Sequence, residues 1–475
     1  MKAWESVRKI TDEAVPRRLA EDEQTWDAMN EVEAQVDFML RLYWDSHVPG
    51  SYAPESLMLA SIQAVENQGK LVENGMDLYE EGLAAFEAED MVALHRVTAK
   101  LKYKVNTAKK DMAHSYWRSA YYDNFTQFAE DSSFPISMDC DVSTDRFLDQ
   151  TYGGWMAQII GAAYGTALEG YTTVQLEKAF GDLDEYVREP NTMNDDITYE
   201  LAFLNAFDHS GYQVTSKEIA AEWMALVPAG WSAEQIALDN IRMGIMPPES
   251  GRLYNPFNEW IGAQMRGAIC GMAAPGNPKL AAELAWKDGE ISHINNGIIG
   301  EVFNAMLVAM AYERQDLRVM LREVIEGLPK ESEYTRIVQF AFNQCNMHED
   351  WRVAWKLCEE KVKRYNWIHA YPNAAAEVIA LWYGNGDFNE TIVLSGKMGQ
   401  DVDCNAAQIL SVLGVMNGIS EIPERWRKPF ANDELETYVR SMKKMTIRSL
   451  TDWTVKAVRK AKEEAENRDG REEAK

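Results

Sequence analysis

The spacing of apolar residues predicts a chain built almost entirely from helices. Near the N-terminus one stripe at helical spacing consists of Val32, Val36, Met39, Leu40 and Tyr43. Later segments carry three more stripes: Leu94, Val97, Leu101 and Val105; Ile197, Leu201 and Leu204; and Val302, Met306 and Met310. Runs that alternate apolar and polar residues, as strands do, are scarce. We therefore expect an all-α protein, a many-helix orthogonal bundle whose loops meet on one face.

Breaks in this pattern divide the chain into three parts. The polar segment 131–145, DSSFPISMDCDVSTD, is interrupted by Pro135 and predicts a domain boundary near residue 140. Residues 1–140 then form an N-terminal helical extension, and residues 141–455, where glycines become frequent, form the larger domain. Residues 456–475 have mixed charge and little apolar periodicity, so we expect a charged tail, a helix that frays into disorder.

The amino-acid composition and net charge of the chain exclude some classes of binding partner. Of 475 residues, 46% are hydrophobic, which allows sizeable cores. The 48 basic and 75 acidic residues give a net charge of −27, which argues against nucleic acid or an anionic membrane as the main partner. Five scattered cysteines fit reduced thiols, and no apolar stretch is long enough to span a membrane. We expect a cytoplasmic protein, whose oligomeric state the sequence leaves open.

The most informative stretch is GQDVDCN, residues 399–405. On a regular helix Asp401 and Asp403 would point about 200° apart, but on a tight turn entering a helix they converge. Gly399 permits such a turn, and Asp403 suits a helix N-cap. Converging carboxylates repel one another unless a cation or a shared proton intervenes. The alternative is a capped helix with a solvated acidic turn.

A second acidic motif lies where a loop enters the helix of Ile197. Asp195 and Asp196 are adjacent there, and Asn194 can add an amide oxygen. Oxygen ligands of this kind suit Mg²⁺. Because the dipole at a helix N-terminus opposes a cation, several carboxylates would be needed. Two solvated capping acids are the alternative.

Three further stretches accompany the acidic motifs. Residues 153–170 read as a helix with glycines four residues apart, a pattern also typical of close helix packing, and they end near Glu169. Gly262 and Arg266 follow a loop rich in Pro and Asn, and His293 precedes an apolar helix. A lone buried histidine is often structural, and Arg266 fits a structural ion pair as well as a substrate contact.

The ordered set of these motifs, from about Gly153 to Gly418, resembles the ADP-ribosylglycohydrolase family. The resemblance implies an all-α fold that holds two Mg²⁺ ions, with Mn²⁺ as the alternative, between the acidic pair and the D-x-D turn. It also implies hydrolysis of a glycosidic bond at the anomeric carbon of a ribose. It does not extend to the first ~140 residues.

The resemblance gives roles to the acidic pair, the D-x-D aspartates, Gly262, Arg266 and His293. Glu169 stands earlier than the glutamate that the family carries, so it, like the loop residues Tyr254 and Asn255, is a candidate by position. The expected metal ligands are Asn194, Asp195, Asp196, Asp401, Asp403 and Cys404; the expected catalytic residues are Asp196 and Glu169; the expected substrate contacts are Gly262, Arg266, His293, Tyr254 and Asn255. Asn194 stands where the family usually has Thr. Cys404 stands where the family usually has Thr or Ser. Because sulfur is a poor Mg²⁺ ligand, Cys404 implies a ligand set without it, a weaker site or a softer metal.

Three functions fit these observations. The first is metal-dependent hydrolysis of an ADP-ribosyl or related ribosyl substrate, either a small molecule or an ADP-ribosylated partner. The second is hydrolysis of another N- or O-glycoside, such as a nucleoside or modified sugar, on the same two-metal site. The third is a non-enzymatic helical binding protein derived from the family.

Overall fold

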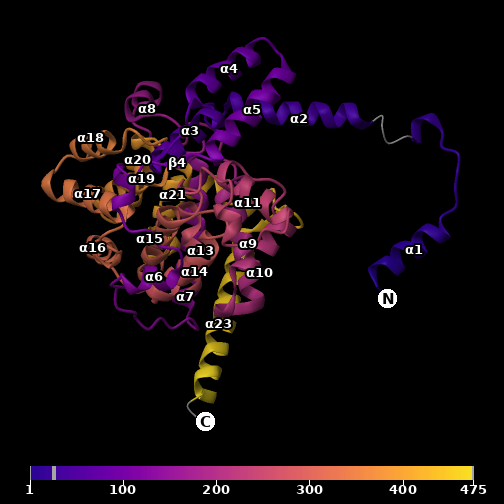
Figure 1. The fold of residues 1–475 in the computed structure, drawn as a ribbon. Coiled ribbons are helices and arrows are strands. Elements are labelled where there is room, and N and C mark those ends of the chain that lie inside the picture. The colour runs from indigo at the N-terminus through magenta and orange to yellow at the C-terminus, as the bar shows by residue number, and fades with distance from the viewer. Residues whose placement is uncertain (1, 24–27, 473–475) are drawn as a thin grey trace.

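The computed structural model describes residues 2–23 and 28–472 as a helical body with an arm at each end of the chain (Figure 1). Strands in the described residues form three antiparallel pairs: β1 (Ser46–His47) with β2 (Pro54–Glu55), β3 (Lys70–Leu71) with β4 (Lys109–Lys110), and β5 (Glu434–Glu436) with β6 (Lys444–Thr446). The predicted all-α class is confirmed. No helix in the described part of the chain is both long and apolar enough to cross a membrane.

The N-terminal region has a small core of its own. Its helices are α1 (Ala3–Glu13), α2 (Met29–Trp44), α3 (Leu57–Asn67), α4 (Gly75–Glu87), α5 (Met91–Asn106) and α6 (Phe125–Glu130). The predicted stripe on α5 is buried against Trp44 and Ile62, as expected. This core ends at Val105, whereas Phe128 already belongs to the core of the body. The division near residue 140 therefore stays a prediction.

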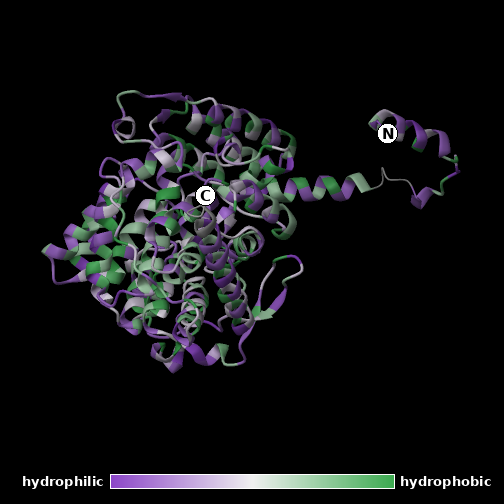
Figure 2. Ribbon diagram, turned by 90° about the horizontal axis from the view of Figure 1, so that it is seen from below, coloured by the Kyte–Doolittle hydropathy of each residue, from purple (hydrophilic) through white to green (hydrophobic). Residues whose placement is uncertain are grey.

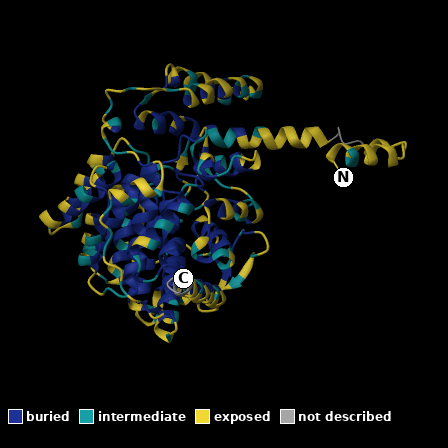
Figure 3. Cartoon of the chain, turned by 60° about the horizontal axis from the view of Figure 1, so that its bottom comes forward, coloured by how far each residue is buried: buried dark blue, intermediate teal, exposed yellow. Residues whose placement is uncertain are grey.

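The stripe predicted on α2 is helical but faces mainly solvent. Leu40 is buried and Tyr43 half-buried, whereas Val32, Val36 and Met39 are exposed. Figure 3 shows most of this helix as exposed, together with α1, in which no residue is buried. The apolar pattern thus predicted the helix but not what it packs against.

The body contains the remaining helices, and its core is continuous. They are α7 (Asp145–Gly165), α8 (Thr173–Phe180), α9 (Asp195–Ser210), α10 (Ser216–Leu226), α11 (Ser232–Arg242), α12 (Glu249–Arg252), α13 (Gly267–Ala273), α14 (Pro278–Gly289), α15 (Asn295–Ala311), α16 (Leu317–Gly327), α17 (Glu333–Met347), α18 (Trp351–Val362), α19 (Ala370–Gly384), α20 (Phe388–Met398), α21 (Val402–Asn417), α22 (Glu424–Arg427) and α23 (Ile447–Glu472). The stripes predicted on α9 and α15 are buried, which confirms them. Every residue of α15 is buried, so this helix lies at the centre.

Helices α7 and α21 pack with their backbones in contact. A Cβ atom at Gly161 would lie 2.5 Å from the carbonyl carbon of Ala406, and one at Gly165 would overlap the backbone of Asp403. At the other end of the pair, Gly153 and Gly414 meet in the same way. The glycines at four-residue spacing thus serve close packing, and this packing places the start of α21 against the end of α7.

The C-terminal segment is helical beyond residue 455, and its division from the body as a tail stays a prediction. Helix α23 continues through residue 455 to Glu472 and packs on α7 and α9. Val455, Val458 and Ala461 are buried, and the Trp155 indole donates a hydrogen bond to the Thr454 hydroxyl at 3.0 Å. Small apolar residues spaced by three among many charges form a stripe too narrow to stand out in the sequence.

Candidate functional site

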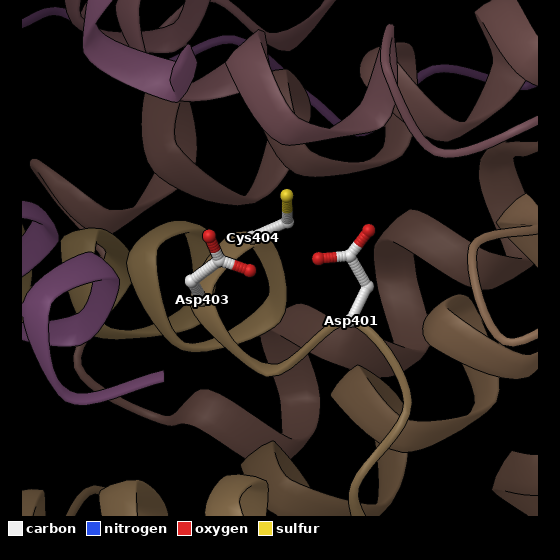
Figure 4. A group of neighbouring side chains, drawn as sticks. All are labelled: Asp401, Asp403 and Cys404. Atoms are coloured by element: carbon white, nitrogen blue, oxygen red, sulfur yellow. The ribbon is translucent and has the colours of Figure 1, made fainter. Parts of the chain in front are cut away.

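The D-x-D turn directs its two carboxylates toward one another. Gly399 and Gln400 both have positive φ, +70° and +68°, and Asp401 is the N-cap of α21. Figure 4 shows the carboxylates of Asp401 and Asp403 facing one another, with the sulfur of Cys404 nearby. Ligand atoms from these three residues lie within 4.8 Å of one another. The turn thus produces the convergence that a regular helix would prevent.

The second acidic motif meets the turn through Asn194. This residue is the N-cap of α9: its Oδ1 accepts a hydrogen bond from the backbone N–H of Asp196 at 2.8 Å. Its Nδ2 donates to Oδ2 of Asp403 at 3.1 Å. Asp196 is completely buried, whereas Asp195 is exposed at the edge of the cluster. Both polar groups of Asn194 are thus occupied within the protein.

Glu169 joins the same cluster from the turn after α7. Its side chain is buried, and its pKa lies well above the ordinary value because of burial and the charges of four aspartates. Those aspartates are Asp403, Asp401, Asp195 and Asp196. The structure therefore gathers five carboxyl groups from three separate segments.

Several buried carboxylate oxygens in the cluster accept no hydrogen bond from the described residues. Among the described residues, Oδ1 of Asp401, Oδ1 of Asp403 and both oxygens of Asp196 are buried without a hydrogen-bond partner. The pKa values of Asp196 and Asp401 lie well above the usual range. Burial is the larger cause, and the charge of Asp403 is the second. A buried acceptor without a donor is costly, and a hard divalent cation would satisfy these oxygens. The residues fit such an ion.

Cys404 contributes less to an oxygen-rich site than its position in the sequence suggests. Its Sγ lies 3.8 Å from the thioether sulfur of Met265. Burial, together with the surrounding aspartates, holds the pKa of its thiol well above the ordinary value. The neutral thiol is a weak ligand for Mg²⁺. The carboxylates are the better donors here.

Arg266 lies in the interior of the body. Its guanidinium is fully buried and pairs with Asp288, with Glu234 at 3.4 Å and with Glu301 at 3.9 Å. It also donates to the Ser292 hydroxyl at 3.0 Å. These contacts match the structural ion pair, and the contact with substrate stays a prediction.

The other expected substrate contacts have mixed surroundings. Gly262 gives room to Glu234, because a Cβ there would overlap its carboxylate. His293 is buried, with Nδ1 2.7 Å from the Ser292 hydroxyl. Asn255 is buried and donates to the carbonyl oxygens of Ala233 and Ser292 at 3.1 and 3.0 Å. These three residues support the loops around Arg266.

Tyr254 is 60% exposed and has a φ of +56°. It lines a cavity of about 210 Å³ between the N-terminal region and α11, together with Tyr43, Leu57 and Phe257. None of the clustered carboxylates lines this cavity. The structure does not bring Tyr254 together with them.

Three residues near the site escaped sequence reasoning. Asn373, on α19, accepts a hydrogen bond at Oδ1 from the backbone N–H of Asp401 at 3.0 Å, which fixes the turn. Burial raises the pKa of Glu234 to about 7, although Arg266 opposes this. Burial and the charge of Asp195 raise the pKa of Tyr438, which follows β5. None of the three stands in a spaced motif, so the sequence gives no signal for them.

The β1–β2 hairpin of the N-terminal region lies beside the carboxylate cluster. Gly50 packs on the Thr166 backbone, and the Tyr171 hydroxyl donates to the carbonyl oxygen of Ser51 at 3.2 Å. These contacts flank Glu169. At the other end of the hairpin, the Trp231 indole donates to Glu55 at 2.8 Å, next to the helix that carries Glu234. The hairpin thus contacts both the turn that carries Glu169 and the helix that carries Glu234. The charge of Asp195 acts on both of these acids.

Comparisons with known proteins agree with this architecture. The family model described as ADP-ribosylglycohydrolase matches residues 143–464. A solved structure described as an ADP-ribosylglycohydrolase-related protein complex superposes with a TM-score of 0.50 and 17% sequence identity, covering 67% of this chain and 99% of that chain. No curated protein matches the sequence. Because the family model spans more than half of the chain, including both acidic motifs and the glycine-rich helix, this protein belongs to the ADP-ribosylglycohydrolase family.

Proposed function

We propose that this protein hydrolyses a glycosidic bond at the anomeric carbon of an ADP-ribosyl or related ribosyl substrate, with a divalent cation bound at the carboxylate cluster. The observation that carries the proposal is the set of buried carboxylate oxygens without partners on Asp196, Asp401 and Asp403. Family membership supports a hydrolase, and metal dependence is a property of that family. Mg²⁺ is the proposed ion, because the available donors are oxygens.

The proposed ligands are Asp196, Asp401 and Asp403, with Asp195 at the exposed edge. These residues would hold the ion, which would supply a Lewis acid that orients the ribose hydroxyls and makes water more acidic. The remaining negative charge of the cluster stabilises the oxocarbenium-like transition state at the sugar. Asn194 aligns the two motifs by capping α9 and donating to Asp403.

Glu169 is the proposed proton-transfer residue. Burial and the charges of the nearby aspartates raise its pKa well above the ordinary value, and a carboxyl group in such a setting can take up and release a proton during the reaction. In the overall reaction, water adds its hydroxyl to the anomeric carbon and its proton to the leaving group. Glu169 would accept the proton of the attacking water, and Asp196 is the alternative base.

The experiment that tests this proposal is release of ADP-ribose from peptides modified on arginine or serine, with Mg²⁺ and with EDTA. We expect release only with the metal, and a rate at least about 100-fold lower in Glu169→Gln, as is typical for loss of a general base. Rates that are equal with Mg²⁺ and with EDTA would contradict the proposal.

A second candidate is hydrolysis of a smaller N- or O-glycoside at the same site. The β1–β2 hairpin favours it, because this segment of the N-terminal region occupies space beside Glu169. Turnover of nucleosides or small glycosides, without action on the modified peptides, would favour this candidate over the first.

A further inference from the structure

The outer part of α2 has an apolar surface with nothing packed against it. From Met29 to Met39 no residue is buried, and Val32 and Val36 are 46% and 50% exposed. Figure 1 shows the helix leaving the body, and Figure 2 shows hydrophobic and hydrophilic residues alternating along it. An isolated helix of this length is marginal in water. A contiguous exposed apolar stripe is typical of an interaction site.

The spacing of this stripe is that of a coiled coil. Its residues Met29, Val32, Val36 and Met39, which we call the α2 seam, follow one another at intervals of three, four and three. This is the a/d pattern that allows one helix to insert its side chains between those of another. Tyr43, the next position of the same register, packs on Trp231 of the body. Leu40 and Trp44 lie beside the seam and are buried, so they anchor the base of α2 to the body.

The charges beside the seam permit a second copy of the same helix. The positions that flank it along the exposed part are Ala28, Glu33 and Gln35, and only Glu33 is charged. Two copies would therefore bring together at most one pair of like charges at the interface, in a chain whose net charge is −27. Repulsion elsewhere on such an acidic surface makes this low-charge stripe the favoured region for self-association.

Helix α1 supplies further apolar surface on the same arm. Trp4, Val7 and Ile10 lie on one side of it and are 66%, 63% and 71% exposed. The α2 seam alone is less than two heptads long and is too short to bury the roughly 1,600 Å² of a typical stable interface. An arm that adds α1 from each copy comes closer to that area.

We propose that two copies of this chain associate through their N-terminal arms, with the α2 seam of one copy packed against the α2 seam of the other. The occupant of the exposed stripe is thus a second α2, and α1 extends the contact. This inference is independent of the chemistry proposed for the carboxylate cluster. It gives the N-terminal region a role that the family domain does not include.

Sedimentation velocity of the full chain from about 1 to 100 µM tests the proposal. We expect the mass of two chains to predominate at the upper end. The double variant Val32→Glu with Val36→Glu should raise the dissociation constant at least about 100-fold, since carboxylates would enter an apolar contact. The matched control Asn30→Glu with Ala34→Glu adds the same charge to the outer face of α2 and should dimerise as the parent does.

Cross-linking provides a second measurement at the seam itself. All five native cysteines are buried, so Val36→Cys would add an exposed thiol. A short bis-maleimide should join two chains of Val36→Cys and should not join chains of Ala34→Cys. A single-chain mass at every concentration, dimerisation unaffected by the seam variant, or equal cross-linking of the two cysteine variants would overturn the proposal.

Discussion

At the scale of single residues, the protein concentrates negative charge where it cannot be solvated. Asp196, Asp401 and Asp403 are nearly inaccessible to solvent, and Glu169 is buried beside them. Carboxylates crowded in this way stabilise a fold only when protons or a cation neutralise them. Both the activity of the site and the stability of the fold should therefore depend on whether protons or a cation are bound to these carboxylates.

The pH dependence of stability should reveal this coupling. Partial loss of solvent and the charge of Asp403 raise the pKa of Asp195 to about 6, and the pKa values of Asp196, Asp401 and Glu169 are raised as well. A carboxyl group with a raised folded-state pKa stabilises the fold below its unfolded value of about 4, and this contribution is lost as pH rises through the folded value. The metal-free chain should therefore lose stability from pH 4 to above pH 6 through these groups.

Mg²⁺ should replace the lost protons, so its effect on the melting temperature should be larger at pH 8 than at pH 5. An ion at about 100 times its dissociation constant adds about 2.7 kcal/mol to the free energy of unfolding. Thermal melts with EDTA and with Mg²⁺ at both pH values measure the difference. An equal or greater effect at pH 5 would argue against a cation on these carboxylates.

The thiol of Cys404 should be nearly irrelevant to Mg²⁺ affinity. It lies beside the Met265 thioether, and the donors that suit Mg²⁺ are the surrounding oxygens. We expect Cys404→Ser to change the Mg²⁺ dissociation constant by less than about threefold, well under 1 kcal/mol. Titration of parent and variant with Mg²⁺ and with thiophilic Cd²⁺ checks this. A parent that binds Cd²⁺ far more tightly than the variant, with weak Mg²⁺ binding in both, would instead identify Cys404 as a ligand.

At the scale of elements, the glycine contacts between α7 and α21 hold the D-x-D turn in place. Gly165→Ala would insert a methyl group into the backbone of Asp403. Overpacking of this kind costs about 1–3 kcal/mol, and it should also weaken Mg²⁺ binding, because Asp403 must move. The matched control is Gly414→Ala, which overlaps Gly153 at the far end of the same helix pair.

We expect Gly414→Ala to lower the melting temperature without changing the Mg²⁺ dissociation constant. Thermal melts and Mg²⁺ titration of both variants separate the two effects. If the variants lose stability and affinity in parallel, the position of Gly165 beside Asp403 has no special importance.

Some features of these elements could be predicted from the sequence, and others could not. Stripes such as that on α5 predicted buried helices because their spacing directly reflects one buried face. Acidic residues are common at a helix entrance, so both acidic motifs became informative only through their order along the chain with the glycine-rich helix and the later motifs. Asn373 could not be found, because it reaches Asp401 from another helix and has no patterned neighbour. The contacts of Arg266 were equally hidden, since its three acidic partners come from three different helices.

At the scale of the whole molecule, the N-terminal region is attached close to the proposed reaction centre. Residues 49–52 form the tip of the loop between β1 and β2, and the Arg188 guanidinium donates to the carbonyl oxygen of Gly50 at 2.9 Å. Replacing these four residues with an Asn-Gly turn preserves a hairpin and removes protein beside Glu169. We expect kcat/KM for an ADP-ribosylated protein to rise relative to that for a small ribosyl substrate.

Parallel assays of the two substrates with parent and shortened hairpin measure this ratio. A Tyr103→Ala variant, altered at an exposed aromatic residue on α5, serves as the control and should leave the ratio unchanged. An unchanged ratio in the shortened hairpin would mean that the N-terminal region does not select substrates by size.

The central claim is that the carboxylate cluster binds a divalent cation. Isothermal titration calorimetry of the metal-free chain with Mg²⁺ tests it most directly, with Asp403→Asn and the exposed-site control Asp452→Asn in parallel. We predict saturable binding to the parent and to Asp452→Asn, and loss of binding in Asp403→Asn, which should fold at least as stably as the metal-free parent because one crowded charge is gone. No saturable binding to the parent, or undiminished binding to Asp403→Asn, would contradict the claim.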